Sequence, residues 1–120
     1  MSYANFTYSN IELNRTTVNA TEPITATVTV TNTGAVTGKE VVQLYLRDLV
    51  GSITRPVKEL KGFQKIELKA GESKKISFTI SVNDLKFYNY DLKYVAEPGD
   101  FKVFIGGNSR DVKEANFKLP

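Results

Sequence analysis

The sequence predicts an all-β fold, an antiparallel β-sandwich of about seven strands. Two stretches alternate apolar and polar residues strictly, Ile24 to Thr31 and Ser73 to Val82. Because successive side chains of a strand point to opposite faces, each stretch has one face for a core and one face for water. Turn-forming residues recur about every ten positions, and no segment has a convincing helical period. Short strands separated by regular turns are typical of a sandwich.

The composition is that of one globular domain. A chain of 120 residues can bury roughly two-thirds of its unfolded surface. The 16 basic and 13 acidic residues are scattered, whereas a nucleic-acid binder concentrates basic charge on one face or helix. No apolar run approaches the roughly 20 residues of a membrane span, and no signal-peptide pattern opens the chain. We therefore expect no nucleic-acid partner and no membrane partner.

The chain contains no cysteine and no histidine. Disulfide bonds and thiolate metal sites are therefore excluded, and so are the commonest general base near neutral pH and the commonest metal ligand. Acidic residues at turn positions, such as Glu72 and Asp100, are expected to solvate the surface rather than to form a catalytic pair. No loop has the ligand spacing of an EF-hand. We expect no catalytic residue, no metal site and no cofactor in these residues.

The first half of the chain is expected to provide three strands. The first lies between Tyr3 and Leu13, with a kink near Ser9 and Asn10, and a polar connection follows. The second is the alternating stretch from Ile24, which Asn32-Thr33-Gly34 ends with residues that tolerate turn geometry. The third follows Gly38 and, with the second, is expected to form the centre of the fold.

The third predicted strand is apolar on both faces over Val41 to Leu46. The sequence does not decide which face meets the core. An outer face that is covered by a loop or by another domain is therefore expected.

The next elements are a strand region, a turn and a strand. The strand region runs from Val57 to Leu68, and Gly62 is expected to mark a bulge or a close backbone approach. A turn follows at Lys69-Ala70-Gly71-Glu72. The next strand points its apolar side chains inward, namely Ile76, Phe78, Ile80 and Val82.

The last third of the chain begins with a segment that lacks a two-residue period, Asn83 to Leu92. A short helical turn is expected at Asp84-Leu85-Lys86. A core strand contains Phe101, Val103 and Ile105, and a last short strand is expected from Asn116 to Leu119.

An aromatic cluster begins in the segment without a strand period and extends two residues beyond it. Its members are Phe87, Tyr88, Tyr90 and Tyr94. Aromatic faces can stack on sugar rings, but they also bury large areas in cores and at interfaces. Tryptophan, a favoured sugar platform, is absent. Closure of the core or docking on another domain is favoured, and sugar binding stays open as an alternative.

Six blocks of sequence, between residues 28 and 101, carry a family resemblance. In chain order they read VTVTNTG, GKEVVQLY, RPVKELKGF, LKAGES, DLKFY and EPGDF. Together they resemble the C-terminal fibronectin type III-like domain of family 3 glycoside hydrolases, of the bacterial periplasmic β-glucosidase and β-xylosidase type. The resemblance implies a fibronectin type III or immunoglobulin-like sandwich. It also implies one domain over 1–120 that is excised from a larger multidomain glycoside hydrolase.

The resemblance implies a non-catalytic fragment with an enzymatic parent. In the family the nucleophile aspartate lies in a (β/α)8-type domain and the acid/base glutamate typically in a following α/β sandwich domain, and neither motif is found here. The parent would hydrolyse β-glycosides with retention, through a covalent glycosyl-enzyme, and β-glycoside would meet this chain only through the parent. The expected partners are the N-terminal catalytic domains of the parent, with a homodimer contact as an open alternative. A periplasmic or extracellular parent is expected.

The expected docking surface consists of bulky residues that have no role in the predicted core. These residues are Arg55, Pro56, Phe87, Tyr88, Tyr90 and Tyr94. Two alternatives stay open. One is a carbohydrate-binding module that acts through Tyr88, Tyr90 and Tyr94, and the other is a free-standing protein-interaction module.

Two residues depart from the family's pattern. Phe101 stands where many members, and other sandwiches with a tyrosine corner, have tyrosine. The corner hydrogen bond to the backbone must therefore be missing or replaced. Gly107 stands where the family often has serine, and this exchange is expected to be neutral.

Overall fold

The computed structural model describes residues 4–48, 59–85, 87–88, 94–96, 98–107 and 112–120. Sheet A contains β1 (Phe6–Tyr8), β2 (Glu12–Leu13), β3 (Ile24–Asn32) and β6 (Ser73–Ile80). Sheet B has the order β10-β9-β4-β5, with β4 at Gly38–Asp48, β5 at Glu59–Leu68, β9 at Gly99–Gly106 and β10 at Val112–Leu119. The 3-10 helix η1 (Val82–Leu85) precedes a small ribbon of β7 (Phe87–Tyr88) and β8 (Tyr94–Val95).

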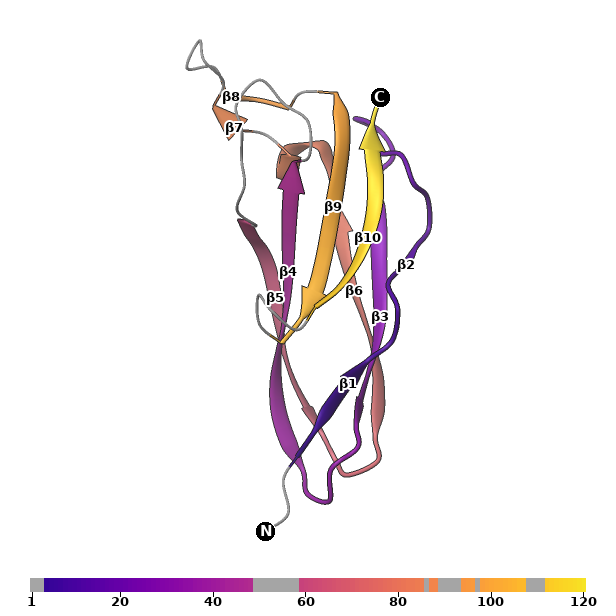
Figure 1. The fold of residues 1–120 in the computed structure, drawn as a ribbon, viewed down its shortest axis with the longest axis vertical. Coiled ribbons are helices and arrows are strands. Elements are labelled where there is room, and N and C mark those ends of the chain that lie inside the picture. Colours follow the sequence, from indigo (N-terminus) through magenta and orange to yellow (C-terminus); the bar gives the residue numbers. More distant parts are fainter. Residues whose placement is uncertain (1–3, 49–58, 86, 89–93, 97, 108–111) are drawn as a thin grey trace.

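The two large sheets pack face to face, and the predicted antiparallel sandwich is confirmed (Figure 1). All the strand pairs within the sheets are antiparallel. The molecule is elongated, 55 × 25 × 17 Å. The strand β1 begins at one end of the long axis and β10 ends at the other (Figure 1). No helix in the described part of the chain has the length and apolar character needed to cross a membrane.

The predicted kink of the first strand is confirmed as a break between β1 and β2. Tyr8 pairs with Val30, whereas Glu12 pairs with Thr27, so the register along β3 shifts by one residue across the break. At the break, Ser9 exchanges two hydrogen bonds with Thr29: its amide donates to the carbonyl oxygen, and its Oγ accepts from the amide. The strands β1 and β2 therefore follow one another along the same edge of β3.

The alternation in β3 and β6 has the predicted consequence. In β3 every second residue from Ile24 is buried, and the threonines between them are half-buried. In β6 the apolar face reaches the core through Ile76, Phe78 and Ile80. The strand ends there, because Val82 begins η1 and is only half-buried. The predicted helical turn is thus confirmed, two residues earlier than expected.

The strands β3 and β4 lie in different sheets, although they follow one another in the chain. Their connection passes from sheet A to sheet B, and Asn32 lies at this crossing with no exposed surface. Its Nδ2 donates to the carbonyl oxygens of Val36 (2.8 Å) and Leu68 (3.0 Å). Its Oδ1 accepts from the amides of Gly34 (2.9 Å) and Asn5 (3.3 Å). One buried side chain therefore joins the two sheets and the turn.

The strand β4 is central in sheet B, and the structure decides which of its faces meets the core. The side chains of Val42, Leu44 and Leu46 are buried in the inter-sheet core. The alternating residues Val41 and Tyr45 lie on the outer face and are half-buried.

The bulge predicted at Gly62 is confirmed. Leu44 pairs with Gly62 and Tyr45 with Leu60, so Lys61 is the extra residue of β5. A Cβ on Gly62 would lie 3.6 Å from the ring of Phe78, which is ordinary van der Waals contact. The bulge, rather than a close approach, therefore accounts for this position.

The turn after β5 also has the predicted position. Gly71 has a φ of 79°, a conformation that glycine adopts without steric cost. Its amide donates to the carbonyl oxygen of Asn32 at 2.8 Å. The side chain of Glu72 accepts from the amide of Lys69, also at 2.8 Å.

The last strand is longer than predicted. It was expected to begin at Asn116, but β10 begins at Val112 and pairs with β9 over its whole length. The error has a physical reason. As an edge strand, β10 has few buried side chains, so its sequence lacks a strong alternation.

Phe101 on β9 and Phe117 on β10 stack with ring centroids 5.5 Å apart and planes at 15°. Both rings are nearly fully buried. Phe101 therefore contributes apolar stacking to the core at this position, and the absence or replacement of the corner hydrogen bond stays a prediction.

Candidate functional site

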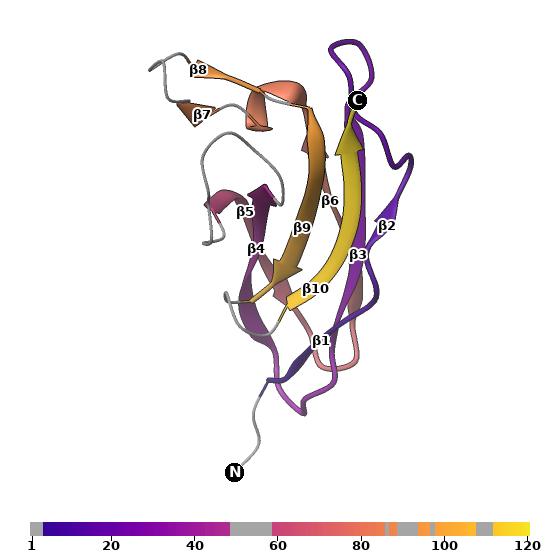
Figure 2. The same ribbon diagram turned by 45° about the horizontal axis from the view of Figure 1, so that its top comes forward.

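The ribbon of β7 and β8 lies at the end of the sandwich where β4 ends and β9 begins (Figure 2). It is held there by η1. Leu85 is buried in the core, and the carboxylate of Asp84 accepts hydrogen bonds from the amide (2.8 Å) and Oγ (3.2 Å) of Ser81. The ribbon is therefore an extension from a well-anchored turn.

The structure brings part of the predicted docking surface together. Tyr88 and Tyr94 are cross-strand partners in this ribbon, and Phe87 pairs with Val95. Residues directly opposite one another in an antiparallel pair share a face of the ribbon. The other predicted docking residues, Arg55, Pro56 and Tyr90, lie outside the described residues.

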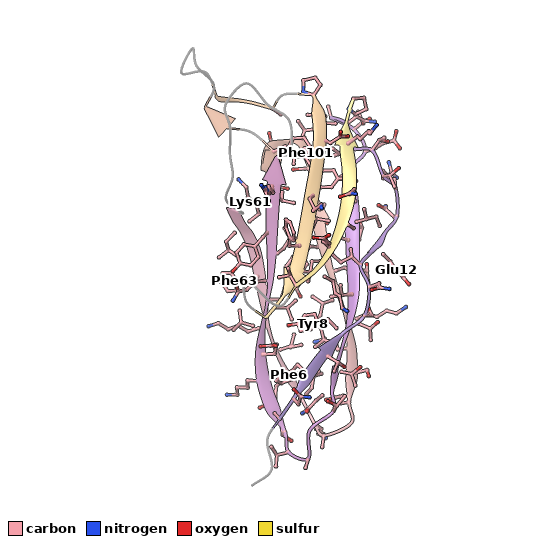
Figure 3. The ribbon with its side chains drawn as sticks, in the orientation of Figure 1. Phe6, Tyr8, Glu12, Lys61, Phe63 and Phe101 are labelled. Carbon is pink, nitrogen blue, oxygen red and sulfur yellow. The ribbon has the colours of Figure 1, made fainter. Side chains whose placement is uncertain are left out.

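A second polar site joins the sheets near the opposite end. Tyr8 on β1 donates from its hydroxyl to Glu40 Oε2 on β4, 3.1 Å away. Burial, the charge of Glu40 and this hydrogen bond together raise the pKa of Tyr8 well above its ordinary value of 10.0. The phenol therefore stays protonated at neutral pH, where it acts as a hydrogen-bond donor and not as a base. Figure 3 shows Tyr8 on the strand that crosses this part of the sandwich.

Gly107 lies against the carboxylate of this pair. A Cβ on Gly107 would lie 2.8 Å from Glu40 Oε2. A side chain there would require the carboxylate to shift, which costs little because it is the end of a flexible side chain. The neutral effect expected for this exchange stays a prediction.

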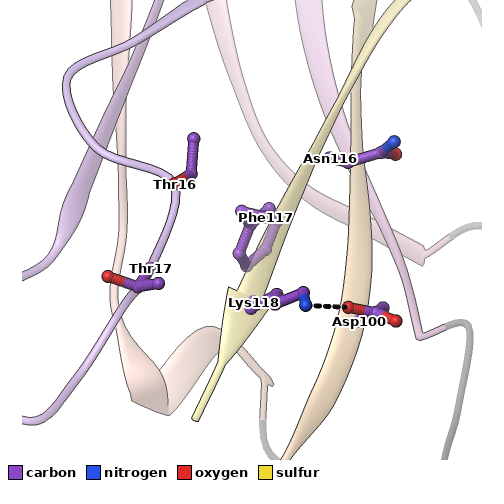
Figure 4. Close-up of a pocket in the computed structure, with 6 residues that line it drawn as sticks. All are labelled: Thr16, Thr17, Asp100, Asn116, Phe117 and Lys118. Atoms are coloured by element: carbon purple, nitrogen blue, oxygen red, sulfur yellow. Dashed lines mark ion pairs between the residues drawn. The ribbon is translucent and has the colours of Figure 1, made fainter.

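One surface hollow has a volume of about 350 Å³. It is lined by Thr16, Thr17, Asp100, Asn116, Phe117 and Lys118 (Figure 4). Asp100 is its single carboxylate and pairs with Lys118 Nζ at 3.8 Å. Glycoside hydrolysis with retention needs two carboxyl groups about 5 Å apart. This hollow therefore does not have the side chains of a hydrolytic site.

A second hollow of about 490 Å³ lies over β4 and β5. It is lined by Lys39, Glu40, Val41, Lys65, Ile66 and Glu67. Register separates its two acids. Glu40 is opposite the core residue Ile66, whereas Glu67 is opposite Lys39 on the outer face. The two carboxylates thus belong to opposite faces of sheet B and do not form a catalytic pair. Among the described residues, no cluster of three or more acidic side chains could hold a metal ion.

The sequence reasoning missed an exposed apolar surface on β5. Leu60 and Phe63 are 52% and 58% exposed. The available signal was the bulge that Gly62 predicted, because an extra residue at Lys61 changes which side chains share a face. The residue pattern of this strand does not indicate its faces, so these two side chains were not singled out.

Comparisons with known proteins agree with this architecture. The family model described as "Fibronectin type III-like domain" matches residues 40–109. The chain is 50% identical to the periplasmic beta-glucosidase of Salmonella typhimurium over 119 residues, which are 99% of this chain and 16% of that protein. It is 46% identical to a beta-xylosidase of Formosa agariphila over 110 residues, 92% of this chain and 15% of that protein.

The chain also matches part of larger solved structures. The beta-glucosidase from Listeria innocua, solved in complex with glucose, superposes with a TM-score of 0.89 at 40% identity. The match covers 98% of this chain and 16% of that chain. The chain therefore spans about one sixth of the length of these relatives.

Proposed function

Because the chain belongs to the fibronectin type III-like domain family, we propose that it is the non-catalytic accessory domain of a β-glycosidase. It supports the catalytic domains of the longer chain. One observation carries this proposal. Nearly the whole chain matches glycosidases that are about six times longer, so the match accounts for 15–16% of each relative.

The parent, on this proposal, is a β-glucosidase-like enzyme that hydrolyses β-glycosides with retention through a covalent glycosyl-enzyme. Its two catalytic carboxylates lie in the preceding domains. Two of the acids that line the hollows already have partners within the domain, which supports the placement of catalysis elsewhere in the parent. Asp100 is paired with Lys118, and Glu40 accepts from Tyr8. The name of the Salmonella relative favours a periplasmic or extracellular parent.

The proposed docking surface for the catalytic domains consists of Arg55, Pro56, Phe87, Tyr88, Tyr90 and Tyr94. Phe87, Tyr88 and Tyr94 lie on the ribbon at the end of the sandwich, and the other three lie outside the described residues. Support comes from the placement of Tyr88 opposite Tyr94, on a ribbon that extends from the core. Aromatic residues are enriched at interfaces because they bury large areas.

The mass and activity of the native polypeptide test the proposal. An antibody against this domain captures the polypeptide from its source cells, and the captured material is assayed with a nitrophenyl β-glucoside. We expect a product several times heavier than 13.4 kDa that hydrolyses the glucoside. A product near 13.4 kDa without activity would contradict the proposal.

A second candidate function is carbohydrate binding through Tyr88, Tyr90 and Tyr94. The cross-strand pairing of Tyr88 with Tyr94 favours it, because adjacent aromatic residues can stack on sugar rings. Titration of the chain with oligosaccharides would then shift tyrosine NMR signals in a saturable manner. Unchanged signals at millimolar sugar would remove this candidate.

A further inference from the structure

The outer face of sheet B carries large apolar side chains that the sandwich core does not use. Leu60 lies opposite Tyr45, and Phe63 lies opposite Gln43. Opposite residues share a face, so Leu60 and Phe63 are on the outer face, away from the core residues of β4. Figure 3 shows Phe63 on β5, next to β4. More than half of each side chain is exposed.

We define the β5 patch as Leu60 and Phe63 together with the half-buried Val41 and Tyr45 of β4. The apolar character continues to β9, where Phe104 lies opposite Tyr45 on the same face. Phe104 is buried, yet it does not belong to the inter-sheet core cluster. The patch is therefore part of an apolar band across three strands.

A partner would pack on the face of β5 and not add a strand to its edge. In the described residues β5 is an edge strand of sheet B. Strand addition needs a regular row of free backbone groups. The bulge at Lys61 interrupts that row between Leu60 and Gly62. Exposed apolar side chains, in contrast, favour a face-to-face contact.

The size of the patch indicates which partner it fits. Leu60 and Phe63 together expose about 200 Å². Stable complexes between separate chains bury about 800 Å² on each partner. A domain of the same chain needs less, because the linker holds it at an effective concentration in the millimolar range. The relatives contain about five times as much additional chain as the match covers, which provides such a domain.

We propose that the β5 patch docks on another folded domain of the same longer chain, through an apolar surface bordered by carboxylates. The charges around the patch are the reason for expecting carboxylates at the rim of the partner surface. Lys39, Lys65 and Arg47 are on the outer face, with Glu67 opposite Lys39. The other charges of this face are Lys102 and Lys118 on β9 and β10, which pair with Glu114 and Asp100. A partner with acidic residues at its rim complements this excess of cations. The docking assignment rests on the proposed accessory function.

Photo-crosslinking in the full-length chain tests the docking. The variant Phe63→benzoylphenylalanine places the crosslinker in the patch. The control is Ser77→benzoylphenylalanine, because Ser77 is exposed on an edge strand of the other sheet. We expect position 63 to crosslink within one chain to a peptide from outside these 120 residues, with at least tenfold higher yield than position 77. Crosslinks between two copies, or equal yields at the two positions, would overturn the proposal.

A second variant separates docking from the accessory function itself. Phe63→Ser in the full-length chain should lower the apparent melting temperature by a few degrees, whereas Ser77→Ala should leave it unchanged. If the native polypeptide is long and hydrolyses β-glucosides but Phe63→Ser melts like the wild type, the docking assignment fails and the accessory function stands. A native polypeptide near 13.4 kDa would contradict both.

Discussion

The two sheets of this sandwich have similar inner faces and different outer faces. Inside, both sheets contribute aliphatic and phenylalanine side chains to one core. Outside, β3 of sheet A presents a row of threonines from Thr25 to Thr31, and β6 beside it presents exposed serine, threonine and lysine. Sheet B presents Tyr45, Leu60 and Phe63 on the corresponding side.

This difference supports the proposal that the β5 patch is the docking surface. On sheet A the hydroxyls satisfy one another across the strands: Thr27 bonds Ser77 at 3.0 Å, and Thr31 bonds Ser73 at 2.8 Å. Such a face is stable in water. On sheet B apolar area stays exposed, and its burial is favourable by about 25 cal/mol per Å².

The largest effect is expected when a phenylalanine of sheet B is removed from the inner face. Phe101→Ala should lower the free energy of unfolding by about 3–5 kcal/mol, because it empties a buried site and ends the stacking on Phe117. Phe63→Ala is the matched control on the outer face of the same sheet and should cost less than about 1 kcal/mol. Urea unfolding of the two variants measures both. Equal losses of unfolding free energy in the two variants would show that Phe63 contributes as much to stability as Phe101.

A smaller effect is expected at the crossing between the sheets. Asn32→Ala should lower the free energy of unfolding by about 2–4 kcal/mol, because it leaves buried amide and carbonyl groups without partners. Asn10→Ala, at an exposed position near the break between β1 and β2, should change it by less than about 0.5 kcal/mol. Chemical denaturation gives both values, and similar stability of the two variants would argue against Asn32 as the junction.

The second link between the sheets should weaken at high pH. Tyr8→Phe should cost about 1–2 kcal/mol at neutral pH through loss of the bond to Glu40. Because the pKa of Tyr8 is raised in the folded state, its contribution is complete below pH 10 and decreases as the pH rises above 10.

Unfolding of the wild type and of Tyr8→Phe, compared between pH 7 and 11, isolates this contribution from other titrating groups. The difference between the two proteins should shrink above pH 10. A difference that stays constant or grows over this range would disprove the assigned role of Tyr8.

The smallest effect is expected on the outer face of sheet A. Thr27→Val makes this face more like sheet B and removes one exposed hydrogen bond to Ser77. Valine has high strand propensity, so stability should change by less than about 0.5 kcal/mol. Thermal unfolding measures it, with Thr29→Val as a second variant on the same face. A large loss would mean that the hydroxyl row is structural rather than a solvated surface.

Part of the candidate site could be anticipated from the sequence. The aromatic residues were singled out because they are bulky and have no role in the predicted core, and the structure pairs two of them, Tyr88 and Tyr94. The shared exposure of Leu60 and Phe63 was not anticipated, although Gly62 signalled a bulge. It depends on the pairing of β5 with β4, and the bulge at Lys61 places Leu60 on the same face as Phe63. The burial of Asn32 was missed for a similar reason. Its bonding partners include Leu68, which is far along the chain.

The sequence by itself determined the local features of this protein. The alternation in β3 and β6 specifies two faces, because side-chain direction in a strand depends only on position along the strand. The turn at Gly71 follows from a backbone conformation that glycine permits, with a φ of 79°. These features do not depend on which strand lies opposite in the sheet.

Only the tertiary structure decided which strands share a sheet and which faces are covered. Both faces of β4 are apolar, and its neighbours β5 and β9 determine that Val42 is inside and Tyr45 outside. The full length of β10 depends on its pairing with β9. Burial is a property of two surfaces that meet, and here those surfaces come from segments far apart in the chain.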